Sequence, residues 1–136
     1  MAFSKPPAAP MSLKVLAHLL SYPDATLRAH LSEMQAVLHE EKAFKTERMT
    51  ELDALISTLG GSDVLDIEAQ YVELFDRGRA TSLHLFEHVH GDSRDRGPAM
   101  IDLAQTYEKA GLFLTPDEMP DYLPVVLQFV STQPPL

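Results

Sequence analysis

Three histidines and a glutamate lie close together near the middle of the chain, in the stretch His84-Leu85-Phe86-Glu87-His88-Val89-His90. The order His-x-x-Glu-His matches zinc peptidases in which two histidines four residues apart hold Zn²⁺ and the glutamate acts as general base. A third protein ligand would be needed, and His90 would point to another side of a continuing helix. In the alternative interpretation the apolar residues are buried and the histidines flank them. We therefore predict neither a metal site nor a catalytic residue, and keep a zinc-dependent hydrolase as an alternative.

Two turns rich in arginine and aspartate flank this stretch, at 76–79 and 91–97. Their acids could form an acid–base pair, but arginines alternate with them, so mutual neutralisation is the simpler explanation. Such a composition is typical of an ion-paired, hydrogen-bonded loop that fixes one helix pair against another. We assign this structural role to Arg77, Arg79, Arg94, Asp95 and Arg96.

The composition indicates one globular domain. The chain has 136 residues, of which 45% are hydrophobic, which is enough for a single core. Its net charge of -9 is uneven, because the part after residue 60 has thirteen acids against five bases. An acidic surface disfavours nucleic acid and favours a cationic partner.

Cysteine is absent, which excludes disulfides, thiolate metal sites and thiol catalysis. The first ten residues show neither a leader peptide nor a cleavage pattern, and no apolar run approaches the length of a membrane span. We therefore expect a cytoplasmic protein with no stable membrane insertion.

Apolar residues recur three or four positions apart along most of the chain, which predicts helices there. We expect a disordered tail over 1–10, a single helical domain over 11–132 and a disordered end over 133–136. The first helix begins at Ser12 and stops before Pro23; the second is capped by Asp24 and runs to about Lys42. The third is capped by Thr46 and ends at Gly60 and Gly61, and the fourth runs from Ser62 to near Gly78.

The second half continues the pattern. Asp92 or Ser93 is expected to cap a helix that Gly111 ends, and Thr115–Glu118 resembles a further helix start. The last helix spans 123–130, with Pro124 in its first turn. No period-two alternation or hairpin dipeptide indicates a strand. The predicted fold is all-α, a compact bundle of about six to seven helices with short loops.

The last predicted helix is amphipathic and needs a partner face, yet the chain ends directly after it. The sequence is therefore expected to be C-terminally truncated, or to cover this face with a second copy in a homodimer.

The central stretch also resembles a known family. The runs YVELFDRGRATSL at 71–83 and LFEHVHGDSRDRGPAM at 85–100 closely resemble the nitrate reductase assembly chaperones of the delta-subunit (NarJ) type, within the TorD/DmsD/NarJ group of redox enzyme maturation chaperones. The resemblance extends over about 13–130 and includes LLSYPD at 19–24 and DYLPVVLQFV at 121–130. His84 stands where the family carries an apolar residue, which weakens the zinc interpretation.

This resemblance implies a helical chaperone without enzymatic turnover or a cofactor of its own. Such chaperones bind the N-terminal, signal-like peptide of the catalytic (alpha) subunit of nitrate reductase. They hold the apoenzyme in the cytoplasm for molybdenum cofactor insertion and prevent premature docking to the membrane subunit. Family members are longer, and their additional helices are expected to contribute to the peptide groove.

A peptide helix can lie in a groove between helices, with its basic residues at an acidic rim. Glu73, Asp76 and Glu87 are candidate rim acids. We assign peptide binding to Tyr71, Leu74, Phe75, Asp76, Leu83, Phe86, Glu87, His88 and Val89. The alternative for each apolar member is an ordinary core position. A non-catalytic helical adaptor, indifferent to the reductase peptide, is the other alternative function.

Overall fold

The computed structural model describes residues 11–42 and 44–133. This part forms eight α-helices: α1 (Met11–Leu19), α2 (Ala25–Ala29), α3 (Leu31–Glu41), α4 (Thr46–Gly61), α5 (Val64–Tyr71), α6 (Leu85–Val89), α7 (Arg96–Lys109) and α8 (Leu123–Ser131). A π-helical turn, η1 (Val72–Asp76), continues α5, and a short 3₁₀ turn, η2 (Arg79–Thr81), follows it. No strand occurs in the described residues, so the all-α prediction is confirmed. The predicted tail at 1–10 and residues 134–136 of the end predicted over 133–136 lie outside them.

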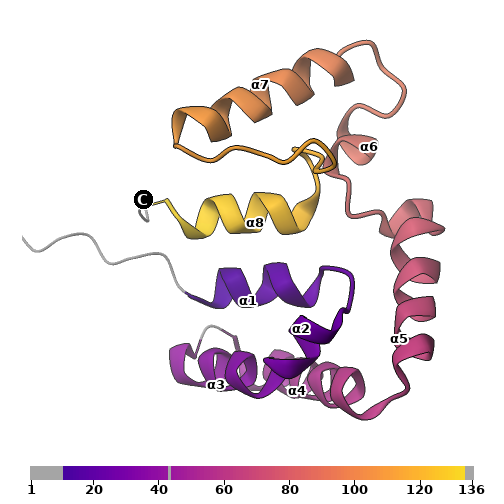
Figure 1. The fold of residues 1–136 in the computed structure, drawn as a ribbon, viewed down its shortest axis with the longest axis vertical. Coiled ribbons are helices and arrows are strands. Elements are labelled where there is room, and N and C mark those ends of the chain that lie inside the picture. The colour runs from indigo at the N-terminus through magenta and orange to yellow at the C-terminus, as the bar shows by residue number, and fades with distance from the viewer. Residues whose placement is uncertain (1–10, 43, 134–136) are drawn as a thin grey trace, which may run out of the picture.

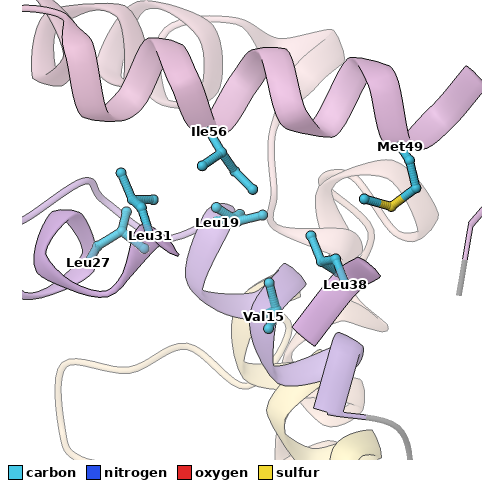
Figure 2. Packing of buried hydrophobic residues seen from close by; sticks show 7 residues of the cluster. All are labelled: Val15, Leu19, Leu27, Leu31, Leu38, Met49 and Ile56. Atoms are coloured by element: carbon cyan, nitrogen blue, oxygen red, sulfur yellow. The ribbon is translucent and has the colours of Figure 1, made fainter. Parts of the chain in front are cut away.

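The first four helices share one hydrophobic core (Figure 2). Helices α1, α2 and α3 contribute leucines to it, and α4 closes it from one side (Figure 2). Leu38 is fully buried. The cluster comprises Val15, Leu19, Leu27, Leu31, Leu38, Met49 and Ile56. Within α1, α3 and α4 these residues recur at helical spacing, which gives each of these helices one apolar face.

Carboxylates fix these helices at their ends and sides. Glu41, at the end of α3, accepts hydrogen bonds from the backbone N–H groups of Met11 (2.9 Å) and Ser12 (2.7 Å), which open α1. A negative charge at a helix N-terminus is stabilising, and the hydrogen bond from the Ser12 hydroxyl lowers the pKa of Glu41. Asp53 of α4 accepts from His39 of α3 at 2.8 Å. The register of α3 against both neighbours is therefore set by polar contacts as well as by the core.

The C-terminal helices pack on the other side of α1. Helices α1 and α8 lie side by side, and α7 lies beyond α8 (Figure 1). Tyr107 of α7 is buried, packs on Phe129 of α8 with ring centroids 4.8 Å apart, and donates to the Pro120 carbonyl at 2.7 Å. Helix α5 runs across the ends of these layers (Figure 1). Among the helices of the described residues, none has the length and apolar composition of a membrane span.

The prediction of a single helix over 24–42 is wrong, because two helices, α2 and α3, occupy this range. Asp24 caps the first as predicted, with its Oδ1 accepting from the Leu27 amide at 2.8 Å. His30 then adopts φ −109° and ψ 9°, which ends α2 and starts α3. The break lets Leu27 and Leu31 reach the same core from two helix directions. No glycine or proline marks it, and the apolar spacing continues across it.

Two further predicted caps are displaced by one residue. Thr46 is the first residue of α4 rather than its cap, and Lys45 precedes it without a side-chain bond. Asp63, not Ser62, caps α5, because its carboxylate accepts from the amides of Leu65 (2.9 Å) and Asp66. An ionised carboxylate accepts a stronger hydrogen bond than a hydroxyl does, and its negative charge is favourable at a helix N-terminus. The predicted stop at Gly60 and Gly61 is confirmed.

The second half also differs from prediction at two places. Helix α7 begins at Arg96 after Asp95, later than Asp92 or Ser93. The predicted helix start at Thr115 forms only a turn. Glu118 accepts from both the amide and the hydroxyl of Thr115 at 2.9 Å, as at a helix N-terminus, but no helix follows before α8. The final helix with Pro124 in its first turn is confirmed, and Gly111, at φ +84°, follows the end of α7.

Candidate functional site

A cleft of about 390 Å³ opens where four segments distant in sequence meet. We call it the tyrosine cleft, because three tyrosines line it. Its walls come from the turn after α1, from α5 and η1, from His84, and from the segment that leads into α8. The lining residues are Ser21, Tyr22, Tyr71, Asp76, His84, Asp117, Glu118, Met119, Tyr122, Pro124, Val125 and Gln128.

The tyrosines hold one another in place. Tyr71 donates its hydroxyl hydrogen to the Leu20 carbonyl at 2.8 Å, and the hydroxyls of Tyr71 and Tyr122 are hydrogen-bonded. Because Tyr71 already donates to Leu20, Tyr122 is the donor in that pair. Tyr22 meets the Tyr71 ring edge-on with centroids 5.5 Å apart. His84 lies over Tyr122, with centroids 5.1 Å apart and planes 31° apart. The result is a fixed aromatic wall.

The cleft has a negative electrostatic character. Its lining includes three carboxylates, of Asp76, Asp117 and Glu118, but neither lysine nor arginine. Burial raises the pKa of Tyr71, and the bond to Tyr122 and the charge of Asp76 add to the shift. Burial and the neighbouring carboxylates raise the pKa of Tyr22 as well. Neutral aromatic faces beside carboxylates suit a guanidinium or ammonium group.

A second cleft of about 400 Å³, more polar, shares Asp76 and His84 with the first. The other lining residues are Phe75, Arg77, Gly78, Arg79, Ser82 and Glu87. A hydrogen bond from Ser82 lowers the pKa of Glu87, and the nearby charges of His84, Arg96 and Arg79 contribute. Glu87 is therefore ionised at neutral pH. We call this neighbouring space the arginine cleft.

Beside these clefts, a short extended pair joins the segment before α6 to the segment before α8. His84 and Tyr122 form an isolated antiparallel bridge, and the Leu123 amide donates to the Leu83 carbonyl at 2.8 Å. Asp121 is fully buried, and its carboxylate Oδ2 accepts from the Phe86 amide at 3.0 Å. It thus satisfies the free N–H at the start of α6. Its other oxygen lies 3.7 Å from His84 Nδ1 and has no hydrogen-bond donor among the described residues.

Replacement of Asp121 by Ala is expected to lower the free energy of unfolding by about 2 kcal/mol, because the Phe86 amide loses its acceptor. Urea denaturation measures this change. The Asp117→Ala variant is the control, since Asp117 is exposed and should shift stability by less than about 0.5 kcal/mol. Asp121→Asn keeps an acceptor oxygen and should lose less than Asp121→Ala. Equal stability of Asp121→Ala and wild type would contradict this role.

Tyr107 makes the fold sensitive to alkali. Burial raises its pKa to about 12, with the Asp121 carboxylate adding to the shift, whereas an unfolded tyrosine titrates near pH 10. The folded state therefore keeps its proton longer, so this stabilisation is complete below about pH 10 and is lost as pH rises to about 12. Up to about 2 kcal/mol should disappear in that interval.

The measurement is urea denaturation at about pH 9 and about pH 11.5, on either side of the unfolded tyrosine's pKa. Tyr107→Phe should show a smaller decrease between the two values, and Tyr71, whose pKa is also raised, accounts for part of what remains. A decrease of equal size in wild type and Tyr107→Phe would show that Tyr107 is not its source.

The structure distributes the nine predicted peptide-binding residues over several environments. Tyr71 and Asp76 line the tyrosine cleft; Phe75, Asp76 and Glu87 line the arginine cleft. Leu83 is buried, and Phe86 packs edge-on against His90. Leu74 is 50% exposed, Val89 is 70% exposed, and neither lines these clefts. His88 contacts the Ser82 carbonyl through Nε2 at 2.9 Å. Their role in peptide binding stays a prediction.

The arginines of the predicted structural loop make few contacts in the described residues. Arg77 pairs with Glu73 at 3.2 Å on an exposed surface, where such a pair contributes little. Arg96 donates to the Gly91 carbonyl at 3.4 Å, and Arg79 lines the arginine cleft. Arg94 and Asp95 are exposed. Their function as a structural unit also stays a prediction.

The geometry required by the zinc hypothesis does not form. His84 precedes α6 in extended backbone (φ −86°, ψ 103°), so His84 and His88 do not share a helical face. No three His, Asp or Glu side chains within the described ranges are grouped to hold a metal ion. His84 instead stacks on Tyr122.

Several residues that line the tyrosine cleft were not predicted from the sequence. Tyr22 lies in the turn after α1, and the others, Asp117, Glu118, Met119 and Tyr122, lie in the segment between α7 and α8. Both segments are far in sequence from the stretch around Tyr71 to which the peptide site was assigned. One usable signal was the acidic, proline-containing run TPDEMPDY at 115–122, because binding residues often lie in loops that a rigid scaffold holds.

Comparison with known proteins places the chain in a family. Residues 24–134 match the family described as nitrate reductase delta subunit. The chain is 48% identical over 124 residues to the nitrate reductase molybdenum cofactor assembly chaperone NarJ of Escherichia coli (strain K12), covering 91% of this chain and 52% of that protein. It is 33% identical to the Bacillus subtilis (strain 168) protein named as a probable chaperone of the same kind, covering 89% of this chain and 65% of that one.

The fold also has a counterpart among solved structures. A crystal structure described as a putative redox enzyme maturation protein from Archaeoglobus fulgidus superposes with a TM-score of 0.62 at 24% identity, covering 96% of this chain and 74% of that one. At this identity the likeness supports the fold alone. The chain spans about half the length of the curated Escherichia coli relatives that it matches. Because the family match covers most of the sequence, the chain belongs to the nitrate reductase delta subunit family.

Proposed function

We propose that this chain acts as a non-catalytic assembly chaperone for respiratory nitrate reductase. In this role it binds the N-terminal, signal-like peptide of the catalytic subunit. It holds the apoenzyme in the cytoplasm for molybdenum cofactor insertion and membrane assembly. Membership of the delta subunit family and the names of the similar proteins support this proposal.

The observation that carries the peptide-binding step is the tyrosine cleft. Aromatic rings from Tyr22, Tyr71 and Tyr122 offer apolar contact, and Asp76 and Glu118 offer charge for a basic residue. A signal-like peptide combines these two features, apolar side chains and arginine or lysine. The cleft has room for a few side chains of such a peptide, and the arginine cleft beside it extends the surface for the next ones.

Isothermal titration of the protein with a synthetic peptide from the N-terminus of a nitrate reductase catalytic subunit tests the proposal, with a chelator present to exclude metal effects. We expect saturable one-to-one binding that weakens as salt is raised, because charges contribute. A peptide with its basic residues replaced by glutamine should bind more weakly.

Binding should also fall when Phe75, which packs on Tyr71 at 4.9 Å between ring centroids, and Phe86 are both changed to Ala. Circular dichroism must show that helicity is retained. No heat with the wild-type protein would contradict peptide binding by this chain and favour the adaptor role.

A further inference from the structure

The turn η1 brings Tyr71 and Asp76 to the same side of the chain. An α-helix would point these two residues in different directions. It is a π-helical turn, in which the Arg77 amide donates to the Val72 carbonyl five residues earlier, at 3.0 Å. Such turns are rare in proteins, and those that do occur are often found at functional sites. Tyr71 precedes η1 and Asp76 ends it, so these two residues are also five apart. Both line the tyrosine cleft.

Helical geometry shows why the π turn matters. An α-helix rotates by about 100° per residue, so Asp76 would point roughly 140° away from Tyr71. Leu74 would then share the Tyr71 face, as the apolar periodicity of the sequence predicts. The wider turn reverses this arrangement: Asp76 reaches the cleft, whereas Leu74 is half exposed and lies outside it. The π register therefore exchanges a leucine for a carboxylate at the cleft wall.

One side chain stabilises this register from outside the turn. The Thr81 hydroxyl donates to the Leu74 carbonyl, inside η1, and also lies 3.2 Å from the Gly78 carbonyl. A Cβ at position 78 would lie 2.7 Å from the Leu74 carbonyl oxygen and would collide with the Thr81 hydroxyl. Only glycine therefore leaves room for the Thr81–Leu74 hydrogen bond.

We propose that Thr81 is a positioning residue for the peptide site. Its hydroxyl holds η1 in the π register and thereby keeps the Asp76 carboxylate in the tyrosine cleft, where it pairs with a basic residue of the peptide. The inference rests on the proposed function, and it concerns one hydrogen bond of a residue that does not line the cleft itself.

The first test needs no peptide. Amide hydrogen exchange measured by NMR reports the Arg77 amide, whose bond to Val72 defines the π turn. Thr81→Val removes the hydroxyl and retains the branched shape, and the Arg77 amide should then exchange at least about tenfold faster (about 1.4 kcal/mol of local stability). Thr81→Ser keeps the hydroxyl and should restore protection. Unchanged exchange in Thr81→Val would overturn the proposal.

The second test is a double-mutant cycle on peptide affinity. Asp76→Asn and Thr81→Val should each weaken binding about fivefold, and the double variant should be no weaker than either, because both remove the same carboxylate contact. Asp117→Asn is the matched control: it removes a cleft acid outside η1, so its effect should multiply with that of Thr81→Val. A Thr81→Val effect that multiplies with Asp76→Asn would overturn the positioning role.

The two tests separate the proposal from the function on which it rests. If the wild-type protein fails to bind the peptide, the proposed function fails, and the exchange measurement alone then decides whether Thr81 holds the π turn. If the peptide binds but Thr81→Val leaves both affinity and exchange unchanged, the chaperone function stands and the role of Thr81 is refuted.

Discussion

Neutralising the three acids of the tyrosine cleft, in the variant Asp76→Asn, Asp117→Asn and Glu118→Gln, should weaken binding of the reductase peptide about 30-fold. Each charge at a partly exposed site contributes up to about 1 kcal/mol to pairing with a cation, and about 2 kcal/mol in total corresponds to this factor. The substitutions keep the size of each side chain, and the amide introduced by Glu118→Gln retains an acceptor oxygen for Thr115. Isothermal titration measures the change.

A control with the same net charge separates the cleft from the general acidity of the chain. Glu40→Gln, Glu47→Gln and Asp102→Asn neutralise three exposed acids that line neither cleft. This variant should bind within about twofold of wild type at about 0.15 M salt, where charges beyond roughly 8 Å are largely screened. Equal weakening in both triple variants would show that long-range attraction, rather than the cleft, recognises the peptide.

The largest effect on stability is expected for Leu38→Ala. Leu38 is fully buried in the core shared by α1, α2, α3 and α4 (Figure 2), and its truncation leaves a cavity that the rigid helices fill only in part. The free energy of unfolding should fall by about 3 kcal/mol, within the range of such substitutions. Because natural domains are stable by only about 5 to 15 kcal/mol, this is a large fraction of the total. Urea denaturation followed by circular dichroism measures it.

Leu55→Ala is the matched control, since Leu55 lies on α4 but is 42% exposed. It removes the same atoms from a helix and should cost less than about 1 kcal/mol. If Leu38→Ala and Leu55→Ala were equally destabilising, burial in this core would not be the reason for the effect of Leu38→Ala. Peptide binding should persist in Leu55→Ala.

Much of the local structure followed from the sequence by itself. Asp24 as a cap, Gly60 and Gly61 as a stop, and Pro124 in the first turn of α8 each act on the nearest backbone groups, so their effect can be predicted without a fold. The all-α class followed for the same reason, since apolar spacing of three and four residues is a property of each helix separately.

Tertiary structure decided where helices break and which side chains meet. The break at His30 lies within unbroken apolar spacing, and across it Leu27 of α2 and Leu31 of α3 both reach the same core. The π turn at η1 places Asp76 in the cleft against the α-helical expectation for Leu74.

The tyrosine cleft itself could not be predicted from local patterns. Its residues come from segments near positions 22, 71–76, 84 and 117–128, and they meet because α8 packs on α1 and the Asp121 carboxylate holds the start of α6. Periodicity describes which face of a helix is apolar, but it contains no information on which distant face that helix will contact. The sequence therefore determined the helices, the family resemblance and one acid of the cleft, Asp76, whereas long-range packing determined the site in which this acid lies.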